Sequence, residues 1–114
     1  HLMGLVSDGG VHSHINHLLA LIALCGQQGA RPQVHVITDG RDTPPRSCEG
    51  YLPPLQEALA AVGGGVATLS GRYYTMDRDH RWERTEMAWR AMVDREGRPA
   101  ASLREGIQAA YAAD

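Results

Sequence analysis

The sequence predicts a three-layer α/β/α fold, a mainly parallel sheet with helices on both faces. Three short apolar runs have the length and composition of buried strands, and a helical pattern of apolar residues follows each of them. This alternation of strand, helix and strand is typical of right-handed parallel crossovers. The predicted strands are Leu2 to Val6, Val34 to Thr38 and Val66 to Leu69.

Each of the first two helices has a recognisable start and end. Ser13 is placed to cap a helix that runs to about Gln28, where Gly29 ends it. The next helix is expected from about Pro53 to Val62, with Pro53 in its first turn, because proline lacks the amide donor that an established helix needs.

Two more helices are expected in the C-terminal half. One spans about Arg78 to Arg95 and is ended by Gly97 and Pro99. The last begins at Ser102, and Glu105 three residues later completes the pattern of a capping box.

Length and composition restrict the class of protein. We expect residues 1–114 to form a single α/β domain, and its opening residues, which already follow a strand pattern, suggest a partial domain from a larger protein. A net charge of −2 gives no reason to expect nucleic acid or a membrane as partner. We expect a cytoplasmic protein whose two cysteines, Cys25 and Cys48, are reduced. All 11 basic residues are arginine, which excludes a Schiff-base lysine or a Walker-type phosphate loop in this segment.

Chemically active residues follow all three predicted strands. The loops are Ser7 to His14, Asp39 to Pro45 and Ser70 to Arg78, and each holds a glycine together with His, Asp or Arg. The carboxyl ends of parallel strands lie at one edge of a sheet, which is where open α/β sheets bind ligands. We therefore expect the three loops to form one site.

Three arginines lie close to the strand ends, namely Arg41, Arg72 and Arg78. A guanidinium can bind phosphate or carboxylate through two parallel hydrogen bonds, so three of them suit a small ligand with two anionic groups. The alternative is that they form surface ion pairs with nearby acidic residues, as we expect for Arg81 and Arg84.

Asp42 is the candidate proton acceptor. It directly follows Arg41, whose charge would hold the carboxylate ionised and ready to take a proton from a substrate hydroxyl. His12 is a second titratable group at the same edge. Asp39 and Asp8 are instead expected to accept hydrogen bonds from backbone amides in their turns.

The histidines of the first loop spell H-x-H-x-x-H and offer a possible metal site. If the helix begins at Ser13, however, His14 and His17 lie on the helix while His12 lies before it. The three side chains then need not converge, and we assign no metal ligand to this chain.

Three motifs give the sequence a resemblance to the cofactor-independent (2,3-bisphosphoglycerate-independent) phosphoglycerate mutases. They are Gly9 to His14 (GGVHSH), Asp39 to Pro45 (DGRDTPP) and Ser70 to Asp79 (SGRYYTMDRD), the last followed by Arg81-Trp82. The motifs occur in order over nearly the whole chain. Three long motifs at consistent spacing make the resemblance highly specific.

The resemblance implies a domain organisation. In that family a phosphatase-like domain, which carries a serine nucleophile and two manganese ions, is joined to a smaller inserted transferase domain. The chain resembles most of this insert, so it is expected to lack the nucleophile and the metal ligands and to hold no cofactor of its own. It also lacks a later arginine pair of the family's domain, and by itself it is expected to be inactive.

The resemblance also implies a reaction and residue roles. The parent enzyme would be an isomerase of glycolysis and gluconeogenesis that interconverts 3-phosphoglycerate and 2-phosphoglycerate through a phosphoserine. The residues expected to hold the substrate are His12, Arg41, Asp42, Arg72 and Arg78. Of these, Asp42 would act as the proton shuttle.

Two other functions remain open from the residues alone. One is a non-catalytic α/β domain that binds a phosphorylated metabolite or a partner protein. The other is a metal-dependent hydrolase that uses the histidine triplet.

Overall fold

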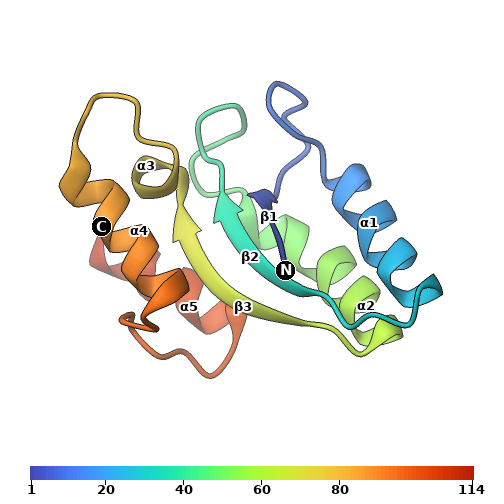
Figure 1. Cartoon of the computed structure of the whole chain (residues 1–114). Coiled ribbons are helices and arrows are strands. Elements are labelled where there is room, and N and C mark those ends of the chain that lie inside the picture. Colours follow the sequence, from blue (N-terminus) through green and yellow to red (C-terminus); the bar gives the residue numbers. More distant parts are fainter.

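The three predicted strands form one parallel sheet in the computed structural model, which describes residues 1–114 (Figure 1). The strands are β1 (Leu2–Leu5), β2 (Gln33–Thr38) and β3 (Gly65–Gly71), in the spatial order β1-β2-β3. Leu2 of β1 pairs with Val34, and Val34 in turn pairs with Val66. The next residue of β2, His35, pairs with Thr68, so β3 bulges at Ala67.

Five α-helices surround the sheet. They are α1 (Ile15–Gln27), α2 (Leu52–Val62), α3 (Arg72–Thr75), α4 (Trp82–Val93) and α5 (Leu103–Ala113), and a 3₁₀ turn, η1 (Cys48–Tyr51), leads into α2. No helix combines the length and apolar character needed to cross a membrane. Cys25 and Cys48 form no disulfide.

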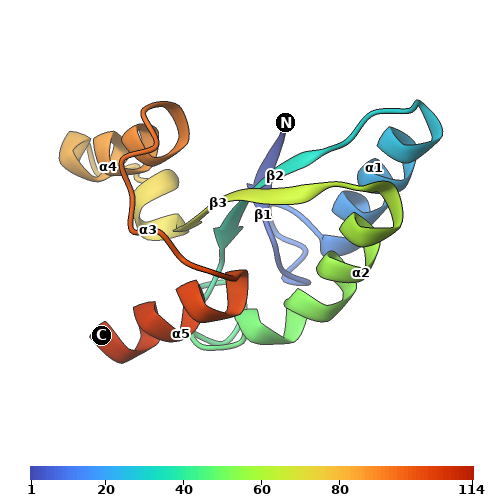
Figure 2. The ribbon, with the colours of Figure 1, turned by 90° about the horizontal axis from the view of Figure 1, so that it is seen from below.

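The layers agree with the prediction of a three-layer α/β/α fold. Buried residues of α1 and α2 pack on one face of the sheet, and the core cluster consists of Val6, Ile15, Ile22, Val34, Val36, Leu55 and Leu59. Leu103 of α5 packs against the same cluster. Figure 2 shows α4 and α5 on opposite sides of β3, so helices lie on both faces. The prediction of the fold class is therefore confirmed.

Two of the predicted helix starts are wrong. His14, not Ser13, caps α1, because its Nδ1 accepts a hydrogen bond from the Asn16 amide (3.1 Å), while the Ser13 hydroxyl donates to the carbonyl of Leu5 at the end of β1 (2.8 Å). The helix expected from Arg78 begins only at Trp82.

The delay of α4 has a local cause. The Asp77 carboxylate accepts hydrogen bonds from the amides of Asp79 (3.3 Å) and Arg81 (2.9 Å), and His80 has a positive φ of 57°. These residues form a turn that is incompatible with a helix. At Ser102 the prediction holds, since its hydroxyl accepts a hydrogen bond from the Glu105 amide (3.1 Å).

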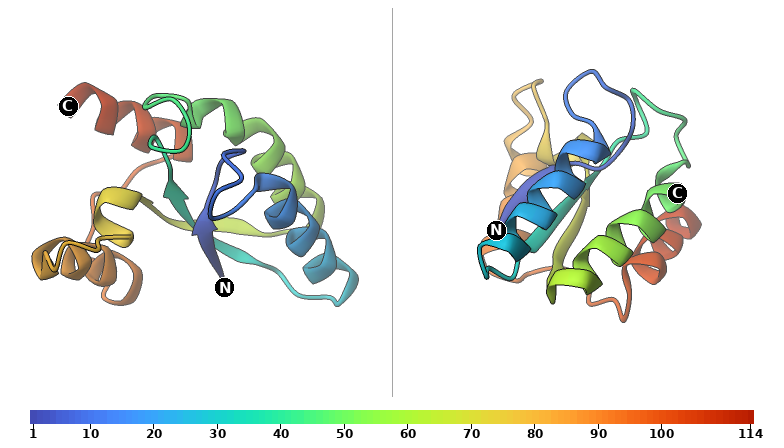
Figure 3. Two further views of the ribbon diagram at one scale, coloured as in Figure 1. Left: turned by 90° about the horizontal axis from the view of Figure 1, so that it is seen from above. Right: turned by 90° about the vertical axis from the view of Figure 1, so that its right-hand side faces the viewer.

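The strand directions place the three loops together. In the right-hand view of Figure 3, the connections that follow β1, β2 and β3 all lie at the same end of the sheet. β3 extends two residues beyond its predicted end, so that Arg72 follows the strand directly as the first residue of α3. The shared edge that the site requires is therefore present.

Candidate active site

Asp39 joins the ends of all three strands. Its Oδ2 accepts a hydrogen bond from the hydroxyl of Ser7, the second residue after β1 (2.7 Å). Its Oδ1 accepts one from Nη1 of Arg72, the first residue after β3 (2.8 Å). Asp39 itself directly follows β2, and only 3% of its side chain is exposed. The three loops are thus connected through one buried carboxylate.

The same carboxylate forms the turn that carries the candidate ligands. Asp39 Oδ1 also accepts hydrogen bonds from the amides of Arg41 (3.1 Å) and Asp42 (2.9 Å), which confirms the predicted role of Asp39. Burial by itself would raise the pKa of Asp39. The hydrogen bonds from the Asp42 amide, Ser7, Arg72 and the Arg41 amide outweigh burial and lower the pKa to about 2.

Two glycines allow this geometry. Gly40 adopts a φ of 70°, which a residue with a side chain rarely takes. A Cβ atom on Gly9 would lie 3.0 Å from Cβ of Asp42 and 3.3 Å from Oδ2 of Asp39. A side chain at residue 9 would therefore press on Asp42 and Asp39, and glycine lets the loop of residues 7–14 lie this close to the loop of residues 39–45.

Arg72 is held by two carboxylates. Its Nη1 donates to Asp39 Oδ1 and to Asp42 Oδ2, both at 2.8 Å, and these are the only hydrogen bonds of its side chain. The two carboxylates raise the pKa of Arg72, with the hydrogen bond to Asp42 as the largest cause. Nε and Nη2 remain free, and these two donors form one of the forks with which a guanidinium binds an anion.

Asp42 therefore has a different partner from the one expected. The sequence suggested its neighbour Arg41, but the guanidinium in contact with Asp42 is that of Arg72. The backbone of Arg41 is fixed by Asp39, and its side chain is exposed and forms no ion pair. Asp42 Oδ2 is occupied by Arg72, while Oδ1 has no hydrogen-bond partner and is available to a ligand.

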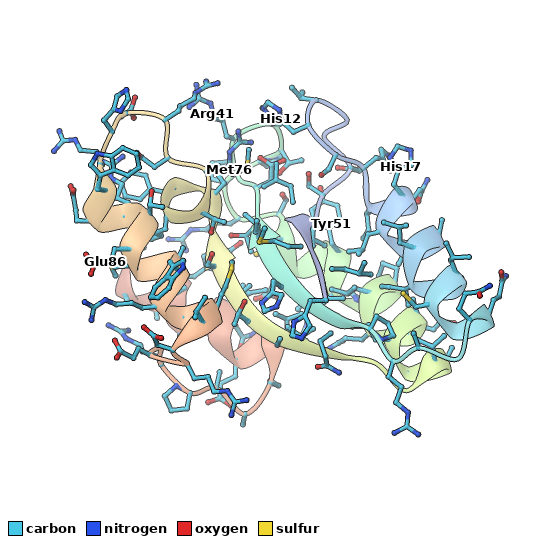
Figure 4. All side chains as sticks on the ribbon, viewed as in Figure 1. His12, His17, Arg41, Tyr51, Met76 and Glu86 are labelled. Atoms are coloured by element: carbon cyan, nitrogen blue, oxygen red, sulfur yellow. The ribbon has the colours of Figure 1, made fainter.

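His12 and Arg41 come from neighbouring loops at the upper edge of the molecule (Figure 4). His12 Nε2 lies 3.9 Å from Asp42 Oδ2, and 43% of the His12 side chain is exposed. Arg78 is also exposed and forms no ion pair. The structure thus joins Asp42 and Arg72 directly and brings His12 beside them, while Arg41 and Arg78 extend from the same edge with free guanidinium groups.

Arg81 forms the surface ion pair expected for it, whereas Arg84 pairs with a carboxylate that is only 3% exposed. Arg84 Nη1 lies 3.3 Å from Asp77, and Arg81 Nη1 lies 4.0 Å from Glu83. Arg41 and Arg78, by contrast, form no ion pair.

Two contacts of the site were not predicted. The Tyr51 hydroxyl donates to Asp8 Oδ1 (2.6 Å), a bond that raises the pKa of Tyr51. Asp8 was expected to accept hydrogen bonds from backbone amides. In the structure its carboxylate accepts from Tyr51, and the neighbouring Gly9 amide donates to the Ser7 hydroxyl (3.3 Å). No sequence pattern indicates the Tyr51 contact, because 43 residues separate the partners. Ser7 could have been suspected, since it closes a strand beside a reactive loop.

The histidine triplet does not act as a unit. His14 caps α1, His17 lies on the exposed side of that helix, and His12 lies next to Asp42. The structure brings together no group of three His, Cys, Asp or Glu side chains that could hold a metal ion. The residues of this chain therefore do not fit a manganese site.

Comparisons with known proteins agree with this geometry. The family model described as "BPG-independent PGAM N-terminus" matches residues 1–114. The 2,3-bisphosphoglycerate-independent phosphoglycerate mutase of Moorella thermoacetica is 53% identical over 116 residues, covering 100% of this chain and 23% of that protein. The enzyme of the same name from Symbiobacterium thermophilum is 54% identical over 98% of this chain and 22% of its own length.

A solved structure gives the same result. The phosphoglycerate mutase of Leishmania mexicana superimposes with a TM-score of 0.93 at 38% sequence identity, covering 100% of this chain and 22% of that protein. The chain therefore spans less than a quarter of the length of the relatives that it matches.

Proposed function

The chain belongs to the family of the BPG-independent phosphoglycerate mutase N-terminus, and we propose that it forms most of the substrate-binding domain of an enzyme that interconverts 3-phosphoglycerate and 2-phosphoglycerate. The observation that carries this proposal is the site at the carboxyl edge of the sheet, where Arg72 and Asp42 form a partly buried pair beside His12. Two unpaired arginines, Arg41 and Arg78, extend from the same edge.

The anionic groups of phosphoglycerate suit these cations. Asp39 and Asp42 balance the charge of Arg72, so the excess positive charge of the site comes from Arg41 and Arg78. We assign Arg41 and Arg78 to attraction and charge balance. Arg72 would orient one anionic group through its free Nε and Nη2 donors.

Asp42 is suited to move a proton. Its free Oδ1 can accept the proton of a glycerate hydroxyl when that hydroxyl takes up the phosphoryl group, and can return it when the group leaves. His12 would bind the substrate beside it. The bond between Oδ2 and Arg72 fixes the direction of the carboxylate.

The remaining chemistry is assigned to a part of the protein outside residues 1–114. We propose that a phosphatase-like domain supplies the serine that carries the phosphoryl group between the two hydroxyls, together with the manganese ions. No metal-binding cluster occurs in this chain, and none of the roles given to its residues depends on a metal. The chain by itself should bind substrate without converting it.

The proposal is tested in the full-length protein that carries this sequence. Conversion of 3-phosphoglycerate is measured without added 2,3-bisphosphoglycerate, and binding is measured by calorimetry. Arg41→Ala removes a charge-assisted contact and should weaken binding by about ten- to one-hundred-fold. Arg98→Ala is the matched control, because Arg98 is exposed, unpaired and lies in the α4–α5 connection, at the opposite end of the sheet (Figure 1).

Two outcomes would contradict the proposal. Equal phosphoglycerate binding by the Arg41→Ala and Arg98→Ala variants would show that the ligand does not bind at this edge. Tight binding of phosphoglycerate by a folded full-length protein without any turnover would favour the non-catalytic binding domain.

A further inference from the structure

We propose that Asp39 is a positioning residue of this site, which sets the relative placement of Arg41, Asp42 and Arg72 without touching the substrate. The inference rests on the proposed function. It concerns a residue that is chemically similar to Asp42 and only three positions away, but that has a different task.

The hydrogen bonds of Asp39 leave little capacity for a ligand. Oδ1 accepts from the amides of Arg41 and Asp42 and from Arg72, and Oδ2 accepts from Ser7. The side chain of Asp39 is 3% exposed, compared with 18% for Asp42. Asp39 therefore lies behind the residues that meet the substrate.

Asp39 determines the orientation of the Arg72 guanidinium. An Nη1 atom carries two hydrogens, and here one bonds Asp39 while the other bonds Asp42. With both hydrogens fixed, the plane of the guanidinium is fixed, and so is the direction of the free Nε and Nη2 donors. Without Asp39, a single bond to Asp42 would remain, and the group could rotate about it.

Asp39 also determines the path of the loop. The amides of Arg41 and Asp42 point at one oxygen atom, which directs the side chain of Arg41 outward and that of Asp42 toward Arg72. The bond to Ser7 adds the end of β1, and Gly9 lets the His12 loop approach. All the proposed ligands except Arg78 are thus placed through this carboxylate.

The charge of Asp39 has a separate role during the proposed reaction. When Asp42 takes a proton, it ceases to be a counter-ion for Arg72. Asp39, whose pKa is about 2, remains ionised and keeps Arg72 paired. The guanidinium can then hold its orientation while the proton moves.

Two substitutions in the full-length protein separate these roles. Asp39→Asn keeps the shape and one acceptor oxygen for the turn amides but removes the charge that holds Arg72. We expect turnover per folded molecule to fall by about ten- to one-hundred-fold, the value of a charge-assisted hydrogen bond, with a smaller change in KM. Asp39→Ala also removes the acceptor for the turn amides, and it should lower turnover by about a further tenfold or more. Asp94→Asn, at an exposed aspartate after α4, is the control.

Hydrogen exchange gives a readout that does not depend on the substrate. In the native protein the amides of Arg41 and Asp42 should exchange slowly, since both are bonded to Asp39. The Asp39→Asn variant should keep most of this protection, and the Asp39→Ala variant should lose it while the core strands stay protected. If Asp39→Ala does not fold, Ser7→Ala serves instead, with a reduction of turnover by about three- to tenfold expected from the loss of one of the hydrogen bonds that hold the Asp39 carboxylate.

The outcomes distinguish the two proposals. Wild-type turnover per folded molecule in both Asp39 variants would overturn the positioning role. So would unchanged protection of the Arg41 and Asp42 amides in Asp39→Ala. If native protein neither binds nor converts phosphoglycerate but Asp39→Ala still releases these amides, the proposed function fails and the placement of the loop by Asp39 stands.

Discussion

Two loops at the carboxyl edge of the sheet are each organised by a buried aspartate, residues 39–43 by Asp39 and residues 77–81 by Asp77. Both side chains are 3% exposed, and each accepts hydrogen bonds from two amides of its own loop. Each also pairs with an arginine, Arg72 in the first case and Arg84 in the second. Each loop presents one exposed and unpaired arginine, Arg41 or Arg78.

The loops differ in what the aspartate is attached to. Asp39 bonds groups that follow β1 and β3, and its arginine is shared with Asp42. Asp77 bonds only its own loop and Arg84, seven residues away on α4. The loop of residues 39–43 is therefore fixed to the sheet, whereas the loop of residues 77–81 is fixed to a helix. We infer that Asp42 and Arg72 act as a preorganised pair and that Arg78 moves with α4.

The largest effect should come from Asp42→Asn, which removes the proton acceptor of the loop of residues 39–43 and keeps the shape of the side chain. Turnover of phosphoglycerate should fall by about 10²- to 10⁴-fold, the usual contribution of a general base. Binding should change by less than about tenfold, because Arg41, Arg72 and Arg78 remain. Steady-state kinetics combined with ligand titration measures both quantities. Normal turnover would reduce Asp42 to a partner of Arg72, and His12 would become the next candidate.

Arg72→Ala should have the next largest effect and should act on stability as well as on binding. The substitution leaves the carboxylates of Asp39 and Asp42 close together without a counter-ion. Breaking a buried ion pair in this way costs about 3 kcal/mol of unfolding free energy. Urea unfolding of Arg72→Ala and of the control Arg98→Ala provides the test. Equal stability of the two variants would show that the loop of residues 39–43 is not held by Arg72.

The sequence predicted the edge of the site better than its internal contacts. The three strands and their shared edge follow from local signals, namely apolar runs bounded by Gly and Pro, and these signals depend on residues close in the chain. The pairing of Arg72 with Asp42 spans 30 residues and depends on the register of β2 and β3. Proximity in sequence suggested Arg41 instead, because sequence distance is the only distance that a single sequence provides.

The late start of α4 shows the same limit on a smaller scale. The residues from Arg78 onward have helical composition, but the Asp77 carboxylate captures the amides of Asp79 and Arg81. A side-chain hydrogen bond to the backbone then competes with the helix. Composition cannot show which of the two arrangements prevails.

The pH dependence of stability should reveal how much the ionised Asp39 carboxylate contributes to the free energy of unfolding. Its pKa is about 2 in the folded protein, against 3.8 for an ordinary aspartate. Between these values the unfolded chain binds a proton that the folded protein does not, so the contribution of Asp39 is complete above about pH 4 and is lost as the pH falls toward about 2. The contribution is about 2 kcal/mol. Urea unfolding across this range should show a steeper loss for native protein than for Asp39→Asn, and parallel curves would contradict the assignment.

Asp77→Asn should have the smallest effect, and it tests the difference between the loops most directly. The substitution removes one charge next to Arg84, but Arg84 also lies 3.9 Å from Asp79 Oδ2 and its guanidinium carbon lies 3.9 Å from the centre of the Tyr73 ring. Because these contacts remain, the loss should be about 1 kcal/mol of stability and a few-fold in phosphoglycerate affinity through Arg78. Calorimetric titration and urea unfolding of Asp77→Asn and Asp39→Asn, compared side by side, measure the contrast. If Asp77→Asn lowered affinity and turnover as much as Asp39→Asn, the loop of residues 77–81 would be coupled to the sheet as firmly as that of residues 39–43, and Arg78 would belong to the same preorganised unit.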